Sequence, residues 1–317
     1  MAFSKNTFLV LFLVLSLVPA SCRQAQEPDS PADKLNVIAT IFPLYDFARV
    51  IGADKVSVTM LLPPGVDAHN YELKPDDILQ ASRADVFLFM HFEMEQWAYK
   101  ITGAATEKSD SLAIEAGEGT ALLRLPRHLH TDGKGHGNHS TRFDPHTWLD
   151  FDNAQKIVDN ITATFISKDL KNSDYYKANA REYKTQLKEL DKKYRRELAD
   201  CESRIILHAG HWAFAYLAKK YNLKYMAAYS ASAEAEPLPH NVFSIIELIN
   251  DMELKYIFYE DLVAPRLAQT IARETDVGML KLNNGHDISK DDLKKGITFL
   301  GLMENNLSNL KKGLSCR

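Results

Sequence analysis

Three histidines in separate segments of the chain have the surroundings expected of metal ligands. His69 follows a Pro-Pro-Gly turn sequence, His146 directly follows a proline, and His211 ends a short His-Ala-Gly-His segment. Each comes after a run that predicts a strand, and loops at the carboxyl ends of strands line the crevice of an open α/β sheet. Three imidazoles with one further donor suit tetrahedral Zn²⁺, whereas carboxylates favour Mn²⁺. The sequence therefore predicts one metal site assembled from distant segments, with zinc as the ion and manganese as the alternative.

A fourth ligand is expected from the segment Asn283-Asn284-Gly285-His286-Asp287 near the C-terminus. Either His286 or Asp287 could serve, and we favour Asp287. No local zinc motif such as His-Glu-x-x-His is present, and a single histidine beside an apolar strand is more often a hydrogen-bonded structural residue. On that ground His208 is less favoured as a ligand. The remaining candidates are interpreted as structural, surface or packing residues: His91, His240, Trp97, Trp148 and Trp212.

A second histidine-rich segment lies between residues 123 and 141. Four histidines stand there among Gly, Asp, Asn and Lys: His128, His130, His136 and His139. Such a composition cannot bury a core, so we expect a mobile loop.

The first 22 residues predict an export signal. Lys5 supplies a positive charge, Phe8–Val18 is an apolar run, and small residues precede Cys22. The run is shorter than the about 20 residues of a membrane-spanning helix, which is typical of a signal peptide. Cys22 predicts a lipobox and a lipid anchor; because Pro19 stands where leucine is usual, plain secretion is the alternative. Residues 23–34 predict a flexible tether, and the mature chain is expected in the periplasm or on the outer face of a membrane.

The only other cysteines are Cys201 and Cys316. In an oxidising compartment two remaining cysteines often pair, so we predict a disulfide that ties the C-terminus to the second half of the chain. Two free thiols are the alternative.

The elements that would position these residues alternate along the chain. Strands are predicted at 35–40, 56–62, 85–90, 204–207, 225–229, 256–259 and 277–282. Helices are predicted at 45–51, 74–82, 152–169, 212–221, 241–250, 264–275 and 299–314. This order predicts two α/β lobes, 35–171 and 201–317, each with a mostly parallel sheet flanked by helices.

A long helix is predicted between the two lobes, over residues 172–200. The segment has neither Gly nor Pro, and its apolar residues recur at spacings of three and four. At 1.5 Å per residue such a helix would be roughly 43 Å long and would act as a rigid spine.

Composition limits the function classes. The chain has 317 residues with 45% hydrophobic and 25% charged residues, which is typical of a globular protein with two domains. The net charge of -4 disfavours nucleic-acid binding. No phosphate-binding Gly-x-x-x-x-Gly-Lys-Ser/Thr loop is present, so the chain is not expected to be an ATPase.

Three segments together resemble a known family: 63–72, 144–150 and 211–217. They are similar to the metal-site segments of the zinc/manganese-binding lipoproteins of bacterial ABC importers, the cluster A-I solute-binding proteins or adhesin family. The resemblance follows the same order over nearly the whole mature chain. It implies that His69, His146 and His211 are ligands, and the histidine at the third position is similar to the zinc-type members. The family often takes an aspartate from the last strand-to-helix loop, but this loop is built differently, so His286, Asp287 or a water remain open.

The resemblance implies a monomeric extracytoplasmic solute-binding protein, not an enzyme. It would capture Zn²⁺ in the cleft between its lobes and deliver it to an ABC transporter permease. The loop from His128 to His139 would collect zinc or sense its excess, with an inert loop as the alternative. Three other functions are weighed: a manganese importer protein, a scaffold or adhesin with a structural metal, and a zinc hydrolase. For the hydrolase, Glu72, Asp150 and Glu236 are candidate bases without a diagnostic arrangement.

Overall fold

The structure is a computed structural model. It describes residues 34–106, 112–126, 143–230, 236–260, 265–286 and 288–317. Lys34–Arg317 forms one compact unit with its own core. The predicted signal peptide, Cys22 and nearly all of the predicted tether lie outside the described residues. Within those residues, no helix combines the length and the apolar character that crossing a membrane would require.

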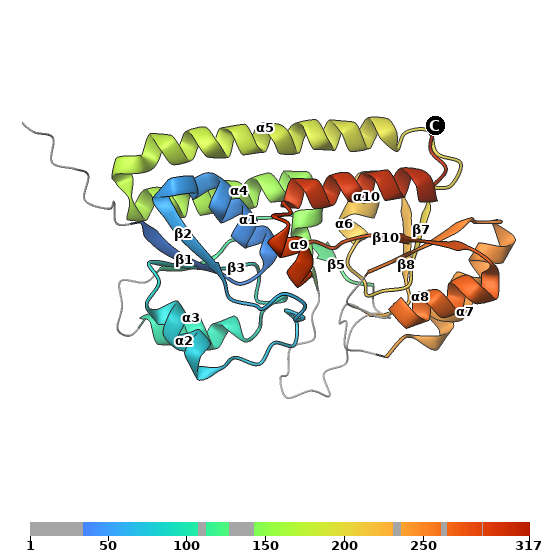
Figure 1. The fold of residues 1–317 in the computed structure, drawn as a ribbon, viewed down its shortest axis with the longest axis horizontal. Coiled ribbons are helices and arrows are strands. Elements are labelled where there is room, and N and C mark those ends of the chain that lie inside the picture. Colours follow the sequence, from blue (N-terminus) through green and yellow to red (C-terminus); the bar gives the residue numbers. More distant parts are fainter. Residues whose placement is uncertain (1–33, 107–111, 127–142, 231–235, 261–264, 287) are drawn as a thin grey trace, which may run out of the picture. The chain divides into compact units, whose positions relative to one another are not determined.

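Two parallel sheets of four strands each form the framework (Figure 1). The first sheet has the order β2-β1-β3-β4 and contains β1 (Leu35–Ala39), β2 (Val56–Met60), β3 (Val86–Phe89) and β4 (Leu112–Glu115). The second has the order β10-β9-β7-β8 and contains β7 (Ile205–His208), β8 (Lys224–Ala227), β9 (Tyr256–Tyr259) and β10 (Gly278–Lys281). Both orders place the first strand of the sheet between strands that come later in the chain. The predicted α/β class with two parallel sheets is confirmed.

Helices cover both faces of each sheet, and we call each sheet with its helices a lobe. In the N-terminal lobe, α1 (Phe42–Gly52) and α4 (Phe151–Lys168) lie on the side of the long helix α5 (Ser173–Glu197), with α2 (Pro75–Ser82) and α3 (Ala98–Thr106) opposite. In the C-terminal lobe, α10 (Phe299–Gly313) packs between α5 and the sheet, while α7 (Pro239–Asp251) and α8 (Pro265–Thr275) lie opposite. The shorter elements are α6 (Ala215–Lys220), α9 (Lys290–Lys294), β5 (Leu123–Arg124), β6 (Phe143–Asp144), η1 (Ala53–Lys55), η3 (Thr147–Leu149) and η4 (Leu170–Asn172).

Helix α5 joins the two lobes, as the sequence predicts. Its buried stripe includes Tyr176, Tyr183, Leu187 and Tyr194 and packs against α1, α4 and α10. The hydroxyl of Tyr194 donates to the carbonyl of Met303, 2.6 Å away in α10. One hydrophobic cluster runs from the first sheet past α5 to the nearer face of the second sheet. The spine is therefore part of a core that both lobes share.

Some local predictions differ from the structure. The helix predicted at 212–221 begins only at Ala215, because the N–H of Trp212 donates to the carbonyl of Ser230 and the N–H of Ala213 donates to the hydroxyl of Tyr225. The short elements α3 and β4 were not predicted. The structure contains the disulfide predicted between Cys201 and Cys316. The lobe boundaries at 171 and 201 stay predictions.

Candidate metal centre

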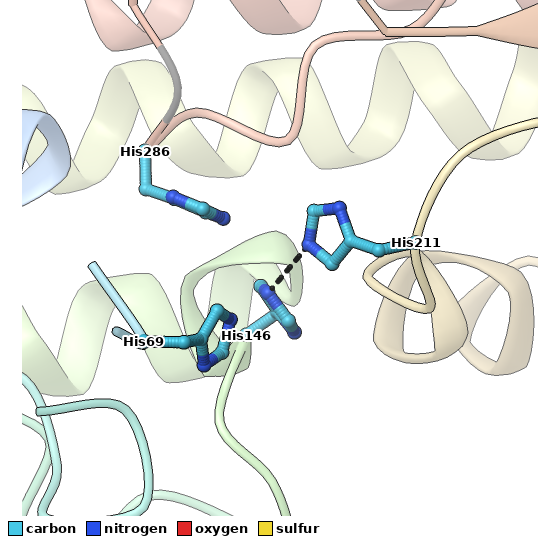
Figure 2. Close-up of side chains that lie close together, drawn as sticks. All are labelled: His69, His146, His211 and His286. Atoms are coloured by element: carbon cyan, nitrogen blue, oxygen red, sulfur yellow. Dashed lines mark hydrogen bonds between the residues drawn. The ribbon is translucent and has the colours of Figure 1, made fainter. Parts of the chain in front are cut away.

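Four imidazole rings meet between the lobes (Figure 2). They belong to His69, His146, His211 and His286, and one nitrogen from each ring lies within 4.8 Å of the others. The Nε2 atoms of His146 and His211 are 3.2 Å apart. A tetrahedral ion with Zn–N bonds of about 2.0–2.1 Å separates its donor atoms by roughly 3.4 Å. Small side-chain movements are therefore enough for all four nitrogens to bind one ion.

Each lobe supplies two of the four rings from loops that follow strands. His69 follows β2 and His146 follows β6 in the N-terminal lobe. His211 follows β7 and His286 follows β10 in the C-terminal lobe. Three of the rings are buried, and His69 is half-buried. The site thus forms only where the two lobes meet.

Asp144 orients His146. One carboxylate oxygen of Asp144, Oδ1, accepts the backbone N–H of His146 at 3.0 Å and contacts its Nδ1 at 2.7 Å. Because a carboxylate accepts, Nδ1 donates and Nε2 is left to face the cluster. Burial, together with the neighbouring histidines, holds the pKa of His146 well below its usual value. His146 is therefore neutral, as a metal ligand must be.

The Asp144 carboxyl is itself buried. Burial raises its pKa to about 7, and the N–H of His146, the nearby His211 and the indole of Trp212 act in the opposite direction. A carboxyl so placed depends on its hydrogen-bond donors to stay ionised.

Glu260 orients His211 in the same way from the C-terminal lobe. It follows β9, and its Oε1 accepts the backbone N–H of His211 at 2.8 Å and contacts its Nδ1 at 2.7 Å. Its Oε2 accepts from the side-chain amide of Asn284 at 2.9 Å. Gly210 makes this approach possible, since a Cβ there would lie 2.3 Å from Oε1 of Glu260. Glu260 was missed from the sequence, where it follows a strand beside Asp261 and belongs to no recognised motif.

Three of the ligand candidates share one local device. An Asp or Asn two residues earlier accepts the backbone N–H of the histidine through its side-chain oxygen, which is an Asx turn. The pairs are His69 with Asp67 at 2.9 Å, His146 with Asp144 at 3.0 Å and His286 with Asn284 at 3.0 Å. The spacing Asx-x-His is readable in the sequence. It is the signal that would have favoured His286 over Asp287.

Two buried tryptophans hold the backbone beside the ligand candidates. The indole N–H of Trp97 donates to the carbonyl of Ala68 at 2.8 Å. The indole N–H of Trp148 donates to the carbonyl of Asn284 at 2.7 Å. Gly285 suits that contact for two reasons, because its φ is +90° and because a Cβ there would lie 3.0 Å from Nε1 of Trp148. Predicted as packing residues, these tryptophans also position the loops of His69 and His286.

The structure brings His69, His146 and His211 together, as predicted, and adds His286. The favoured alternative, Asp287, lies outside the described residues. So do the four histidines of the predicted loop, His128, His130, His136 and His139, and the predicted lipidation site Cys22.

The other histidines have separate environments. His91 is buried and contacts Glu115 at 2.7 Å and Thr120 at 3.1 Å. His208 is buried at the end of β7, where burial lowers its pKa to about 4, and it is not part of the four-histidine cluster. His240 is exposed at the start of α7.

The candidate base Asp150 is occupied elsewhere. It caps α4 by accepting the N–H of Asp152 at 2.8 Å and pairs with Lys220 at 2.6 Å. Neither Glu72 nor Glu236 belongs to the cluster, whose described members are all histidines. Among the described residues, none of the three candidate bases therefore belongs to the cluster.

Comparisons with known proteins agree with this geometry. The family model described as zinc-uptake complex component A, periplasmic, matches residues 37–313. The high-affinity zinc uptake system protein ZnuA of Bacillus subtilis (strain 168) is 32% identical over 320 residues, which is 98% of each chain. The zinc-binding lipoprotein AdcA of Streptococcus pneumoniae R6 is 28% identical over 97% of this chain, which spans 61% of that protein.

Solved structures show the same fold. The Zn(II)-bound ZnuA-like domain of Streptococcus pneumoniae AdcA has a TM-score of 0.74 at 28% identity, covering 89% of this chain and 99% of that chain. The laminin-binding protein Lmb of Streptococcus agalactiae, described as bifunctional with adhesin and metal transporting activity, has a TM-score of 0.77 at 26% identity over 89% and 99%.

Proposed function

The chain belongs to the family of periplasmic zinc-uptake components, and from this premise we propose that it captures Zn²⁺ between its lobes for an ABC-type permease. The observation that carries the proposal is the convergence of His69, His146, His211 and His286 on one centre. These four residues are the proposed ligands. His286 takes the fourth position in place of the favoured Asp287.

The donor set supports zinc over manganese. All four described donors are imidazole nitrogens, which suit zinc, whereas manganese favours carboxylate and water oxygens. The carboxylates of Asp144 and Glu260 lie behind the rings and contact Nδ1 atoms. They increase the basicity of the rings as ligands.

Transport, and not catalysis, fits this shell. A catalytic zinc keeps one position open for water or substrate, whereas four protein ligands fill a tetrahedral shell. The family consists of uptake components, so the hydrolase alternative is set aside.

Release requires the two pairs of ligands to separate. His69 and His146 belong to one lobe, and His211 and His286 belong to the other. Because both lobes share a core around α5, we expect loop adjustments and modest lobe movement. A permease that holds the two lobes slightly apart would lower the affinity for the ion.

Three further features belong to this proposal. The chain acts as a monomer outside the cytoplasm, anchored through a lipid on Cys22. The histidines from His128 to His139 collect zinc weakly or sense its excess. Replacement of Cys22 with alanine should move the protein from the membrane fraction to the soluble fraction.

A competition titration tests the ion and the site. The exported protein is stripped with a chelator, and zinc and manganese are added separately and together at pH 7.5. We expect one tight zinc equivalent per chain, resistant to excess manganese. His146→Ala should weaken it by roughly a hundredfold or more, because one of four ligands is lost.

The matched control is His240→Ala, which removes an exposed imidazole outside the cluster and should bind zinc as the unaltered protein does. Preferential binding of manganese would assign the chain to the manganese importers. Absence of tight binding of either ion would overturn the proposal.

A further inference from the structure

The chain has three tryptophans, and each lies beside a proposed ligand segment. Two of them, Trp97 and Trp148, donate their indole N–H to carbonyls in the loops of His69 and His286. The third, Trp212, directly follows His211 and behaves differently. Its Nε1 atom is buried and has no hydrogen-bond partner among the described residues.

A matching acceptor is found in the other lobe. Oδ2 of Asp144 is also buried without a hydrogen-bond partner in the described part of the chain, although Oδ1 of the same carboxylate holds His146. The two groups are neighbours, since the indole of Trp212 is close enough to lower the pKa of Asp144. A buried donor and a buried acceptor therefore stand close together without completing a hydrogen bond.

The indole is fixed from its own lobe. The backbone N–H of Trp212 donates to the carbonyl of Ser230 at 2.9 Å. Its ring packs on Tyr225 with centroids 4.6 Å apart, and the hydroxyl of Tyr225 donates to the carbonyl of His211 at 3.0 Å. Any movement of His211 therefore carries Trp212 with it.

Asp144 moves with the other ligand. Its Oδ1 holds both the backbone N–H and Nδ1 of His146. Adjusting His146 and His211 to one ion therefore also changes the distance between Asp144 and Trp212.

We propose that Trp212 is a positioning residue of the site, whose indole N–H donates to Oδ2 of Asp144 once a bound ion fixes His146 and His211 in its coordination shell. This inference rests on the proposed function. Burying a donor and an acceptor apart costs free energy, which their hydrogen bond recovers. The added donor stabilises the ionised carboxylate that orients His146. Through Trp212, the C-terminal lobe thus influences how strongly His146 of the N-terminal lobe binds the ion.

Indole N–H resonances report on this bond directly. Uniformly ¹⁵N-labelled exported protein should give three indole cross-peaks, assigned with Trp97→Phe, Trp148→Phe and Trp212→Phe. On addition of one equivalent of zinc, the Trp212 proton should move downfield. The Trp97 and Trp148 protons, already bonded to carbonyls, should move less. A Trp212 proton that stays in place, or moves no more than the other two, would overturn the inference.

Zinc affinity gives the second test. Trp212→Phe keeps the ring on Tyr225 and removes the donor, so it should weaken zinc binding on the order of tenfold. In an Asp144→Asn background, the amide Nδ2 would face the indole donor to donor, and Trp212→Phe should have little further effect. Equal losses in both backgrounds would show a merely structural role and overturn the inference.

The two hypotheses fail in distinguishable ways. If the unaltered protein binds no zinc, the proposed function fails and the inference with it. If the unaltered protein binds zinc tightly and Trp212→Phe binds it equally well, only the inference fails. Should the variant not fold, the resonance measurement on the unaltered protein still decides.

Discussion

The two lobes share a strand order but use its switch point differently. In each sheet the order reverses between its first and third strands, β1 and β3 or β7 and β9, where open α/β sheets bind ligands. Between β7 and β9 stand His211 and the buried Glu260 that orients it. Between β1 and β3 stand Thr40 and a second buried glutamate, Glu95.

The two glutamates serve different partners. Glu95 accepts the backbone N–H groups of Met90 at 2.7 Å and His91 at 3.3 Å and contacts the hydroxyl of Thr40. It therefore holds the turn after β3, while Glu260 holds a proposed ligand. The proposed ligands of the N-terminal lobe come from other loops, after β2 and β6. The shared topology therefore places a buried glutamate at the switch point of each sheet. The group that contacts the glutamate then determines its role, which is to hold a turn in one lobe and to orient a proposed ligand in the other.

The largest effect is expected for the disulfide in the described part of the chain. It closes a loop in the C-terminal lobe and has no counterpart among the described residues of the N-terminal lobe. It links Cys201 to Cys316 across 115 residues. Replacing both cysteines with serine should lower the free energy of unfolding of the metal-free protein by about 4–5 kcal/mol, because the unfolded chain regains the freedom of a long loop. Denaturant titration measures the loss. Reduction of the unaltered protein is the control, and unchanged stability in both would contradict the prediction.

Glu95 should make stability depend on pH. Burial raises its pKa to about 7, so its contribution is full below its ordinary value near 4.5 and is lost as the pH rises through 7. Glu95→Gln keeps an acceptor for the two backbone N–H groups and removes the titration. The stability of the variant relative to the unaltered protein should rise by about 3 kcal/mol between pH 4 and pH 8. Chemical denaturation of the metal-free proteins tests this, and a difference that is constant with pH would refute it.

Replacement of Glu260 should weaken zinc binding and not only destabilise the fold. Glu260→Gln weakens the acceptor for Nδ1 of His211 and turns an amide toward the donating amide of Asn284. We expect zinc affinity to fall roughly tenfold to a hundredfold. Glu95→Gln is the matched control and should bind zinc normally. If both variants bind zinc equally well, the predicted functional difference between the two switch points is contradicted.

The smallest effect is expected at Asp67. It accepts the backbone N–H of the half-buried His69, whereas Asp144 holds both the N–H and the ring of the buried His146. Asp67→Ala should weaken zinc binding about fivefold, because one hydrogen bond contributes about 1 kcal/mol net. Asp144→Ala should weaken it by roughly ten to a hundredfold. Competition titration of the two variants compares them, and equal losses would contradict this ranking.

Much of the fold could be predicted because it depends on local patterns. The spine appears at Ser173–Glu197, close to the predicted 172–200, since its apolar spacing and lack of Gly and Pro are visible in the sequence. Three of the four clustered histidines, His69, His146 and His211, could be predicted from their places after strands and from the family resemblance.

The remaining features depend on packing between distant segments. Glu260 and Glu95 follow strands and belong to no recognised motif, and only the folded chain buries them beside their partners. The predicted helix at 212–221 starts late because Ser230 and Tyr225 hold its first residues. His286 joins the cluster through a turn in which its backbone N–H donates to the side chain of Asn284. The Asn284 side chain is the local hint to that turn.

The short contact between His146 and His211 has a consequence for the energetics of uptake. Because Nδ1 of each ring contacts a carboxylate, the Nε2 lone pairs of the two neutral rings face each other 3.2 Å apart. An ion relieves their repulsion by binding both lone pairs, and a proton taken up between the rings in acid must leave before the ion can bind. Binding enthalpies measured in acidic buffers of different ionisation enthalpy should differ in proportion to the protons released. In acid, ion capture is thus a cation exchange, and an acidified compartment would oppose loading of the site.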